Sequence, residues 1–176
     1  NYNGKPTVEV PYLRVANVQD GYLDLSEIKT IQALPSEVDE LKLQVGDILM
    51  TEGGDFDKLG RGAIWHGQVE VCIHQNHIFR VRLKNPVVLP EFFEAFLLSR
   101  FAKDYFMTAS KQPTNLATIN MTQLKSLRTP MPPIHLQQKF VGVARKHERL
   151  RSQQREGLRQ AEHLFETLLQ KAFEGE

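Results

Sequence analysis

The sequence predicts an α+β protein, in which an irregular mixed α/β domain is followed by a long C-terminal helix of the coiled-coil type. Three observations predict this fold class. Short β-branched segments separated by glycine and acidic turns fill the first half, which is typical of strands. Aromatic residues four apart follow Pro90, and a proline-free stretch rich in helix formers follows Ile134.

The expected strands of the first half are residues 12–18, 48–50 and 78–83, and Gln19-Asp20-Gly21 forms a turn after the first. Residues 51–62, TEGGDFDKLGRG, are too polar and too rich in glycine to predict a regular element.

The second half changes to a helical period. Pro90 suits a first helical position, and Phe93, Leu97, Phe101 and Tyr105 would form one stripe against the core. A loop over 111–125 and the pair Pro132-Pro133 then lead to the last helix.

That last helix, residues 134–173, would span about 60 Å. It carries a seven-residue apolar repeat with apolar ends and a polar middle, which predicts a helical partner along its length. The residues expected at the helix interface are Phe140, Val143, His147, Leu150, Leu158, Ala161, Leu164, Phe165 and Leu168.

Composition excludes several classes of protein. The chain has 176 residues and one cysteine, which excludes a disulfide scaffold and a zinc site built on several thiolates. Without an apolar membrane span or a leader, we expect a cytoplasmic protein. Since the sequence opens with Asn1 rather than Met, we expect it to be a piece of a longer protein.

Charge is unevenly distributed along the chain. Residues 1–60 carry a net charge of −6, residues 61–133 a net +5, and residues 134–176 a net +2. The basic segment favours contact with a polyanion, although solvated charged faces are also common.

Two polar loops are candidates for that contact. In the first, Lys58 and Arg61 suit phosphate oxygens, or the glycines only permit a wide turn. The spacing does not fit a P-loop. In the second, Lys111, Gln112, Thr114 and Asn115 combine a cation with donors and acceptors suited to groove edges, or form a hydrogen-bonded loop.

His74, Asn76 and His77 form a third polar cluster. A metal site with Cys72 is not favoured, because alternation along a strand would turn His77 to the other face. These side chains suit hydrogen bonding to base edges, or to backbone beside the loop.

No catalytic constellation is present: Glu40-Leu41-Lys42 has a nuclease-like spacing but is better explained as a surface pair. We therefore expect no catalytic residues, no metal and no cofactor in this chain.

Four ordered blocks carry a family resemblance: PYLRVANVQDG at 11–21, VGDILMTEGGDFDKLGRGAIW at 45–65, CIHQNHIFRVR at 72–82 and KQPTNLATINMTQLK at 111–125. Together with the long helix they resemble the DNA-specificity (S) subunit of type I restriction–modification systems. Pro113 stands where relatives often have Thr.

The resemblance implies that residues 1–133 form a target-recognition domain and residues 134–176 a spacer and docking helix. It also implies that the N-terminal side of this domain is trimmed, because PYLRVAN lies a short way into the domain in the family. It implies a non-enzymatic subunit that reads one half of a split site on double-stranded DNA. Methyltransferase and restriction subunits would supply the chemistry, with S-adenosylmethionine, ATP and magnesium. The helix also suggests a homodimer. The alternatives are the specificity domain of a fused restriction–methyltransferase, or a coiled-coil scaffold that does not bind DNA.

Overall fold

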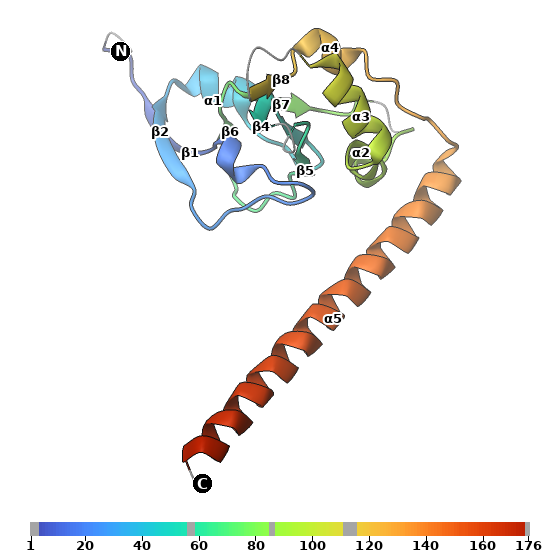
Figure 1. Cartoon of the computed structure of the whole chain (residues 1–176). Helices are drawn as coiled ribbons and strands as arrows, with labels where there is room; N and C mark the ends of the chain where they lie inside the picture. The colour runs from blue at the N-terminus through green and yellow to red at the C-terminus, as the bar shows by residue number, and fades with distance from the viewer. Residues whose placement is uncertain (1–3, 56–58, 85–86, 111–115, 175–176) are drawn as a thin grey trace. The chain divides into compact units, whose positions relative to one another are not determined.

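The computed structural model describes residues 4–55, 59–84, 87–110 and 116–174. The chain forms two compact units, Asn1–Ile134 and His135–Glu176, which are considered separately below. Figure 1 shows the elements in chain order.

The first sheet has the strand order β2-β1-β6. Strand β1 (Val8–Leu13) pairs antiparallel with β2 (Lys29–Ala33) and parallel with β6 (Ile73–His74). Helix α1 (Pro35–Leu41) packs through Val38 against the buried residues of this sheet. The helix starts at a proline, and the Glu37 carboxylate accepts a hydrogen bond from the Leu34 N–H at 2.8 Å, which satisfies an N-terminal donor.

The second sheet has the order β5-β3-β7, with β3 (Ile48–Thr51) in the centre. Its antiparallel partners are β5 (Gly62–Ile64) and β7 (Ile78–Val81). All four residues of β3 are buried, and burial on both faces explains why Ile48, Leu49 and Met50 are all apolar. Helices α2 (Pro90–Leu97) and α3 (Arg100–Ala109) bury their apolar faces in the core that contains this sheet.

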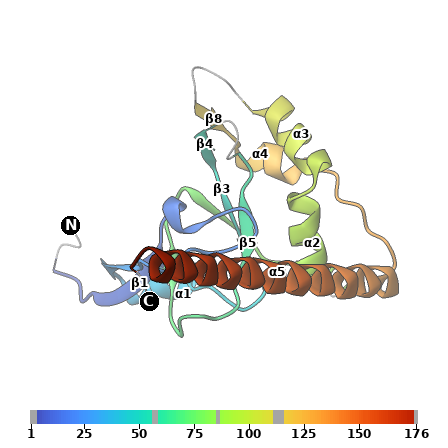
Figure 2. The ribbon, with the colours of Figure 1, turned by 60° about the horizontal axis from the view of Figure 1, so that its bottom comes forward.

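A two-stranded ribbon completes the strands: β4 (Gly53–Asp55) pairs antiparallel with β8 (Leu116–Thr118). Figure 2 shows β4 and β8 side by side. The short helix α4 (Met121–Lys125) follows β8. It begins at a reciprocal cap, in which the Asn120 side chain accepts from the Gln123 N–H at 2.9 Å and the Gln123 side chain accepts from the Asn120 N–H at 2.7 Å.

Helix α5 (Ile134–Glu174) has 41 residues and confirms the long C-terminal helix expected from the sequence. Together with the mixed α/β elements of the first unit, it confirms the α+β fold class. The large apolar residues expected at the helix interface are 46–64% exposed. Among the described helices, none combines the length and the apolar character needed to cross a membrane.

Three expectations about local structure were wrong. The expected strand 12–18 ends at Leu13, because residues Val15–Asn17 turn into a 3-10 helix, η1. The loops expected over 51–62 and 111–125 contain β4 and β8, which pair only with each other and so carry no local signal.

The third concerns the aromatic stripe. The helix that starts at Pro90 ends at Leu97, and α3 starts after Ser99, whose side-chain oxygen caps it by accepting from the Ala102 N–H. The break changes the helical phase, so Phe93 and Leu97 are buried, whereas Phe101 is 63% exposed.

Candidate nucleic-acid interface

The β4–β8 ribbon brings together the two polar loops that the sequence singled out. The register pairs Gly53 with Thr118 and Asp55 with Leu116. Asp55 is the last described residue before the segment that holds Lys58, and Leu116 is the first after the segment that holds Lys111. Both segments therefore join the described structure at the same end of the ribbon.

Five of the expected contact residues lie in those two segments, outside the described residues: Lys58, Lys111, Gln112, Thr114 and Asn115. The close pairing of β4 with β8 depends on a glycine in β4. A Cβ at Gly53 would lie 2.9 Å from the Thr118 Cγ2 and 3.0 Å from the Ala117 carbonyl oxygen. Only glycine allows β8 to approach this closely, so Gly53 serves strand pairing.

The turn that carries His77 is attached to the other end of the ribbon, next to β4. The Glu52 N–H donates to the His77 carbonyl at 3.0 Å, and the Ile119 N–H donates to the Glu52 carbonyl at 2.7 Å. The His77 Nδ1 lies 2.9 Å from a Glu52 carboxylate oxygen, and 69% of the His77 side chain is exposed. Since Glu52 and Asp55 are three residues apart along the chain, the two ends are separated by about 10 Å.

The exposed turn also presents Asn76. It is closed by a hydrogen bond from the Ile78 N–H to the Gln75 carbonyl at 3.0 Å, and Gln75, Asn76 and His77 are all exposed. Asn76 and His74 line a groove of about 230 Å³, together with Tyr12 and Ile31 of the first sheet.

His74 is partly buried, unlike the exposed candidates Asn76 and His77. Its Nδ1 lies 3.1 Å from the Gln75 carbonyl, so Nδ1 carries the hydrogen of the neutral ring. The buried Nε2 has no hydrogen-bond partner within the described parts of the chain. Burial lowers the pKa of His74 and keeps the ring neutral.

Arg61 directly precedes β5 of the second sheet. Its carbonyl accepts from the Thr51 N–H at 3.0 Å, and its guanidinium donates to the Gln19 side-chain oxygen at 2.8 Å. The Arg61 guanidinium, which the sequence assigned to phosphate contact, is therefore held by Gln19 in the loop that follows β1.

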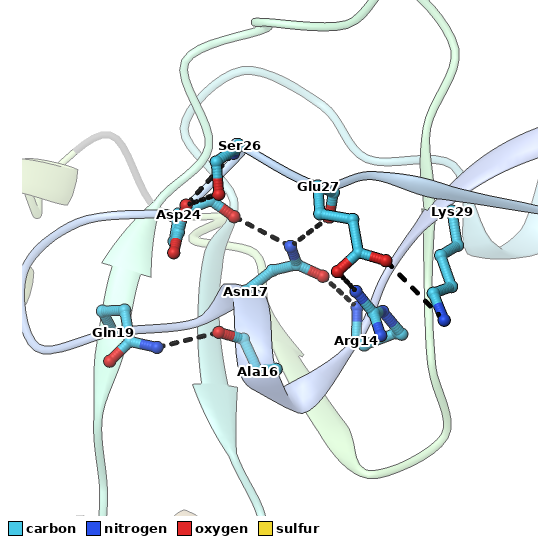
Figure 3. A network of polar contacts seen from close by, with 8 residues as sticks. All are labelled: Arg14, Ala16, Asn17, Gln19, Asp24, Ser26, Glu27 and Lys29. Carbon is cyan, nitrogen blue, oxygen red and sulfur yellow. Dashed lines mark hydrogen bonds and ion pairs between the residues drawn. The ribbon is translucent and has the colours of Figure 1, made fainter.

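That loop, residues 14–28, is held by a buried asparagine that the sequence analysis did not single out (Figure 3). The Asn17 side chain accepts from the Arg14 N–H at 2.8 Å and donates to the carbonyls of Asp24 and Glu27 at 2.8 and 3.0 Å. Gln19 donates to the Ala16 carbonyl at 2.8 Å, which fixes its amide next to Arg61. The 11–21 block contains both residues, but only contacts distant in sequence distinguish them from ordinary loop residues.

Several cations of the basic segment are engaged in internal contacts. Arg80 donates to the carbonyls of Glu40 and Lys42 at the end of α1, at 2.8 and 3.2 Å. Arg82 forms a two-point ion pair with Asp47 at 2.6 and 2.7 Å, and the Asp47 side chain is 1% exposed. The net +5 of residues 61–133 therefore overstates the positive charge available to a partner.

The described residues hold no group of three or more His, Cys, Asp or Glu arranged to bind a metal ion. The thiol of Cys72 is buried, and burial raises its pKa to about 11. At neutral pH the thiol stays protonated and is a poor nucleophile.

The fold defines a class of proteins in which an irregular α/β domain precedes a long helix. A solved member is the HsdS subunit from Thermoanaerobacter tengcongensis, with a TM-score of 0.63 and 17% identity; the match covers 84% of this chain and 38% of that chain. At this identity the similarity concerns the fold.

Sequence comparison leads to the type I restriction enzymes. The chain is 29% identical to the EcoKI specificity subunit of Escherichia coli K12 over 172 residues, which cover 94% of this chain and 37% of the relative. It is 26% identical to the EcoBI specificity subunit of Escherichia coli, over 95% of this chain and 35% of that relative. A putative MjaX specificity subunit from Methanocaldococcus jannaschii is 26% identical over 79% of this chain and 33% of its own length.

The resemblance to type I specificity subunits is thus confirmed, and the chain spans about a third of the length of these relatives. No family model matches the sequence. Relatives named as specificity subunits favour neither a fused restriction–methyltransferase nor a scaffold that does not bind DNA.

Proposed function

We propose that this chain is a non-catalytic DNA-recognition module that reads one half of a split target site. Residues 1–133 would recognise the half-site, and residues 134–176 would act as spacer and docking helix for methyltransferase and restriction subunits. The relatives are named as specificity subunits of restriction enzymes, which supports this assignment. We place this DNA recognition in the cytoplasm.

The observation that carries the proposal is the β4–β8 ladder. It joins two polar segments that are distant in sequence and that lead to Lys58 and to Lys111. Glu52 links the base of the same ribbon to the exposed turn with Asn76 and His77. A ribbon that continues at one end into segments whose sequences contain lysine, and that carries amide and imidazole groups near its other end, suits combined contact with phosphates and base edges.

The candidate residues would divide into two roles. Lys58, Arg61 and Lys111 would bind phosphates. Asn76, His77, Gln112, Thr114 and Asn115 would face base edges. His74, whose Nδ1 is bonded to the Gln75 carbonyl and whose Nε2 is buried, would contribute to DNA binding by holding the turn with Asn76 and His77.

Selection of duplexes from a randomised DNA pool tests the function. The purified chain would be used at low and near-physiological salt, and bound duplexes would be sequenced. We expect enrichment of a short defined half-site. Binding without enrichment, or no binding at low salt, would refute sequence recognition by this chain.

Substitutions test the two roles on the selected duplex. The double variant Lys58→Ala, Arg61→Ala should weaken all sequences alike and flatten the salt dependence of log K by about two units, since each phosphate contact contributes roughly 0.9. Asn76→Ala should cost roughly 1–3 kcal/mol at one base position and relax specificity only there. Exposed Ser26, outside the candidate residues, provides the control Ser26→Ala, which should bind as wild type.

We further propose that two copies pair through α5 and read a symmetric site. The exposed apolar residues of α5 support this, because the seven-residue repeat places them on one side of the helix. Light scattering at high concentration should give a dimer, and Leu150→Gln with Leu164→Gln should give a monomer. A wild-type monomer at high concentration would exclude the pairing.

A further inference from the structure

Helix α5 carries its arginines and its lysines on different sides of its axis. With 100° per residue and Arg145 set at 0°, the helix-interface residues occupy an arc from about 100° to 220°. Five arginines occupy the arc from about 240° through 0° to 40°, roughly opposite, and they are Arg145, Arg149, Arg151, Arg155 and Arg159.

The lysines of α5 lie elsewhere. Lys139, Lys146 and Lys171 fall between about 80° and 120°, at the border of the apolar arc. Lysine stems commonly cover the edge of an apolar surface in this way. We call the opposite arc the arginine face, because it carries arginines and no lysine. The planar guanidinium of arginine can form two hydrogen bonds with one phosphate group.

The formal charge of the arginine face is positive between residues 145 and 159. Glu148 lies 3.3 Å from Arg151 and 3.4 Å from Arg155, and Glu156 lies 2.7 Å from Arg159. Between residues 145 and 159, five arginines against these two glutamates give a formal net charge of +3. Glu162, Glu166 and Glu174 fall on the same arc beyond Arg159, so the positive charge is confined to this stretch. The pairs are exposed, and exposed pairs contribute little stability, so a polyanion can displace them.

The length of this face suits a DNA segment outside the half-site. From Arg145 to Arg159 the helix rises about 21 Å. That length corresponds to about six base pairs at roughly 3.4 Å per pair. Since the apolar arc lies on the opposite side, pairing with another helix would leave the arginine face accessible.

We infer that the arginine face of α5 binds the phosphate backbone of DNA beyond the half-site. The inference rests on the proposed function, because it assigns a second, sequence-independent contact to a chain that reads one half of a split site. The contact would add affinity and salt dependence without adding base specificity.

The experiment compares two duplexes with the full chain: the selected half-site alone, and the same half-site extended by ten base pairs on each side. The test variant is Arg151→Gln, Arg155→Gln, Arg159→Gln, in which glutamine keeps a helix propensity close to that of arginine. The control Lys5→Gln, Lys29→Gln, Lys42→Gln removes the same charge from residues 1–60.

Wild type should show a salt slope on the extended duplex steeper by two to three units than on the half-site, at roughly 0.9 per phosphate. For three contacts, the extended duplex would lose about 40-fold more affinity than the half-site between 50 and 200 mM salt. The arginine variant should lose this increment and bind the half-site as wild type, while the lysine control keeps the increment. Glu148→Gln with Glu156→Gln should bind the extended duplex more tightly, because it removes competing carboxylates.

The inference is overturned if the arginine variant keeps the increment, or if wild type shows none. In both cases, binding of the half-site would leave the proposed function intact, and an acidic protein surface would become the expected partner of the face. Absence of any selected half-site would instead remove the proposed function and this inference together. Circular dichroism should show equal helix content in all variants.

Discussion

Asn17→Ala is expected to destabilise the first unit strongly, although Asn17 lies in a loop. The residue is 4% exposed, and its side chain makes three hydrogen bonds to the backbone of residues 14, 24 and 27. Alanine removes all three and leaves one N–H and two carbonyls without these partners. At about 1 kcal/mol for each bond, the free energy of unfolding should fall by roughly 3 kcal/mol.

Urea unfolding followed by tryptophan fluorescence measures this change. Trp65 is the single tryptophan of the chain and is 1% exposed within the first unit, so its signal reports that unit. The midpoint of thermal unfolding should fall by about 6–12 °C. A second variant, Asn17→Asp, keeps the acceptor for Arg14 but turns a carboxylate towards two carbonyls, and it should be no more stable than Asn17→Ala.

The matched control is Asn76→Ala, the same change at an exposed asparagine, which should alter stability by less than about 0.5 kcal/mol. The two variants should therefore separate folding from DNA reading. A loss below about 1 kcal/mol in Asn17→Ala would refute the reasoning that this asparagine organises the loop.

Three further predictions concern buried titratable groups. Burial holds the pKa of His74 below its ordinary 6.5, so the unfolded chain takes up the proton first and the free energy of unfolding should fall as pH decreases below 6.5. His74→Gln should reduce this pH dependence, measured by urea unfolding from pH 7.5 to 5. Equal pH dependence of the unfolding free energy in the variant and in wild type would contradict it. Arg82→Ala leaves the buried Asp47 carboxylate without its ion-pair partner and should lower the unfolding free energy by about 3–5 kcal/mol in the same assay, whereas a change below 1 kcal/mol would argue against the pair. Because the Cys72 thiol is buried with a pKa raised to about 11, a thiol reagent at pH 8 should modify it only in denaturant, and rapid modification of the native chain would disprove this.

The sequence by itself determined the long helix and its two chemical faces. A proline-free stretch after Pro132-Pro133, with apolar residues every three or four positions, fixes both from local periodicity. The buried strand β3 and the first turn of α2 at Pro90 were also predictable, because apolar runs and helix-start residues act locally.

Only the tertiary structure decided how the polar loops are combined. β4 and β8 have three residues each, with glycine in β4, and neither predicts a strand until the other lies beside it. The same holds for Asn17, whose role depends on carbonyls up to ten residues away, and for Arg80 and Arg82, which read as available cations but bind the end of α1 and Asp47. Hydrogen bonds and ion pairs between distant segments form only when the chain is folded, so residue type alone does not reveal which polar groups remain available to a partner.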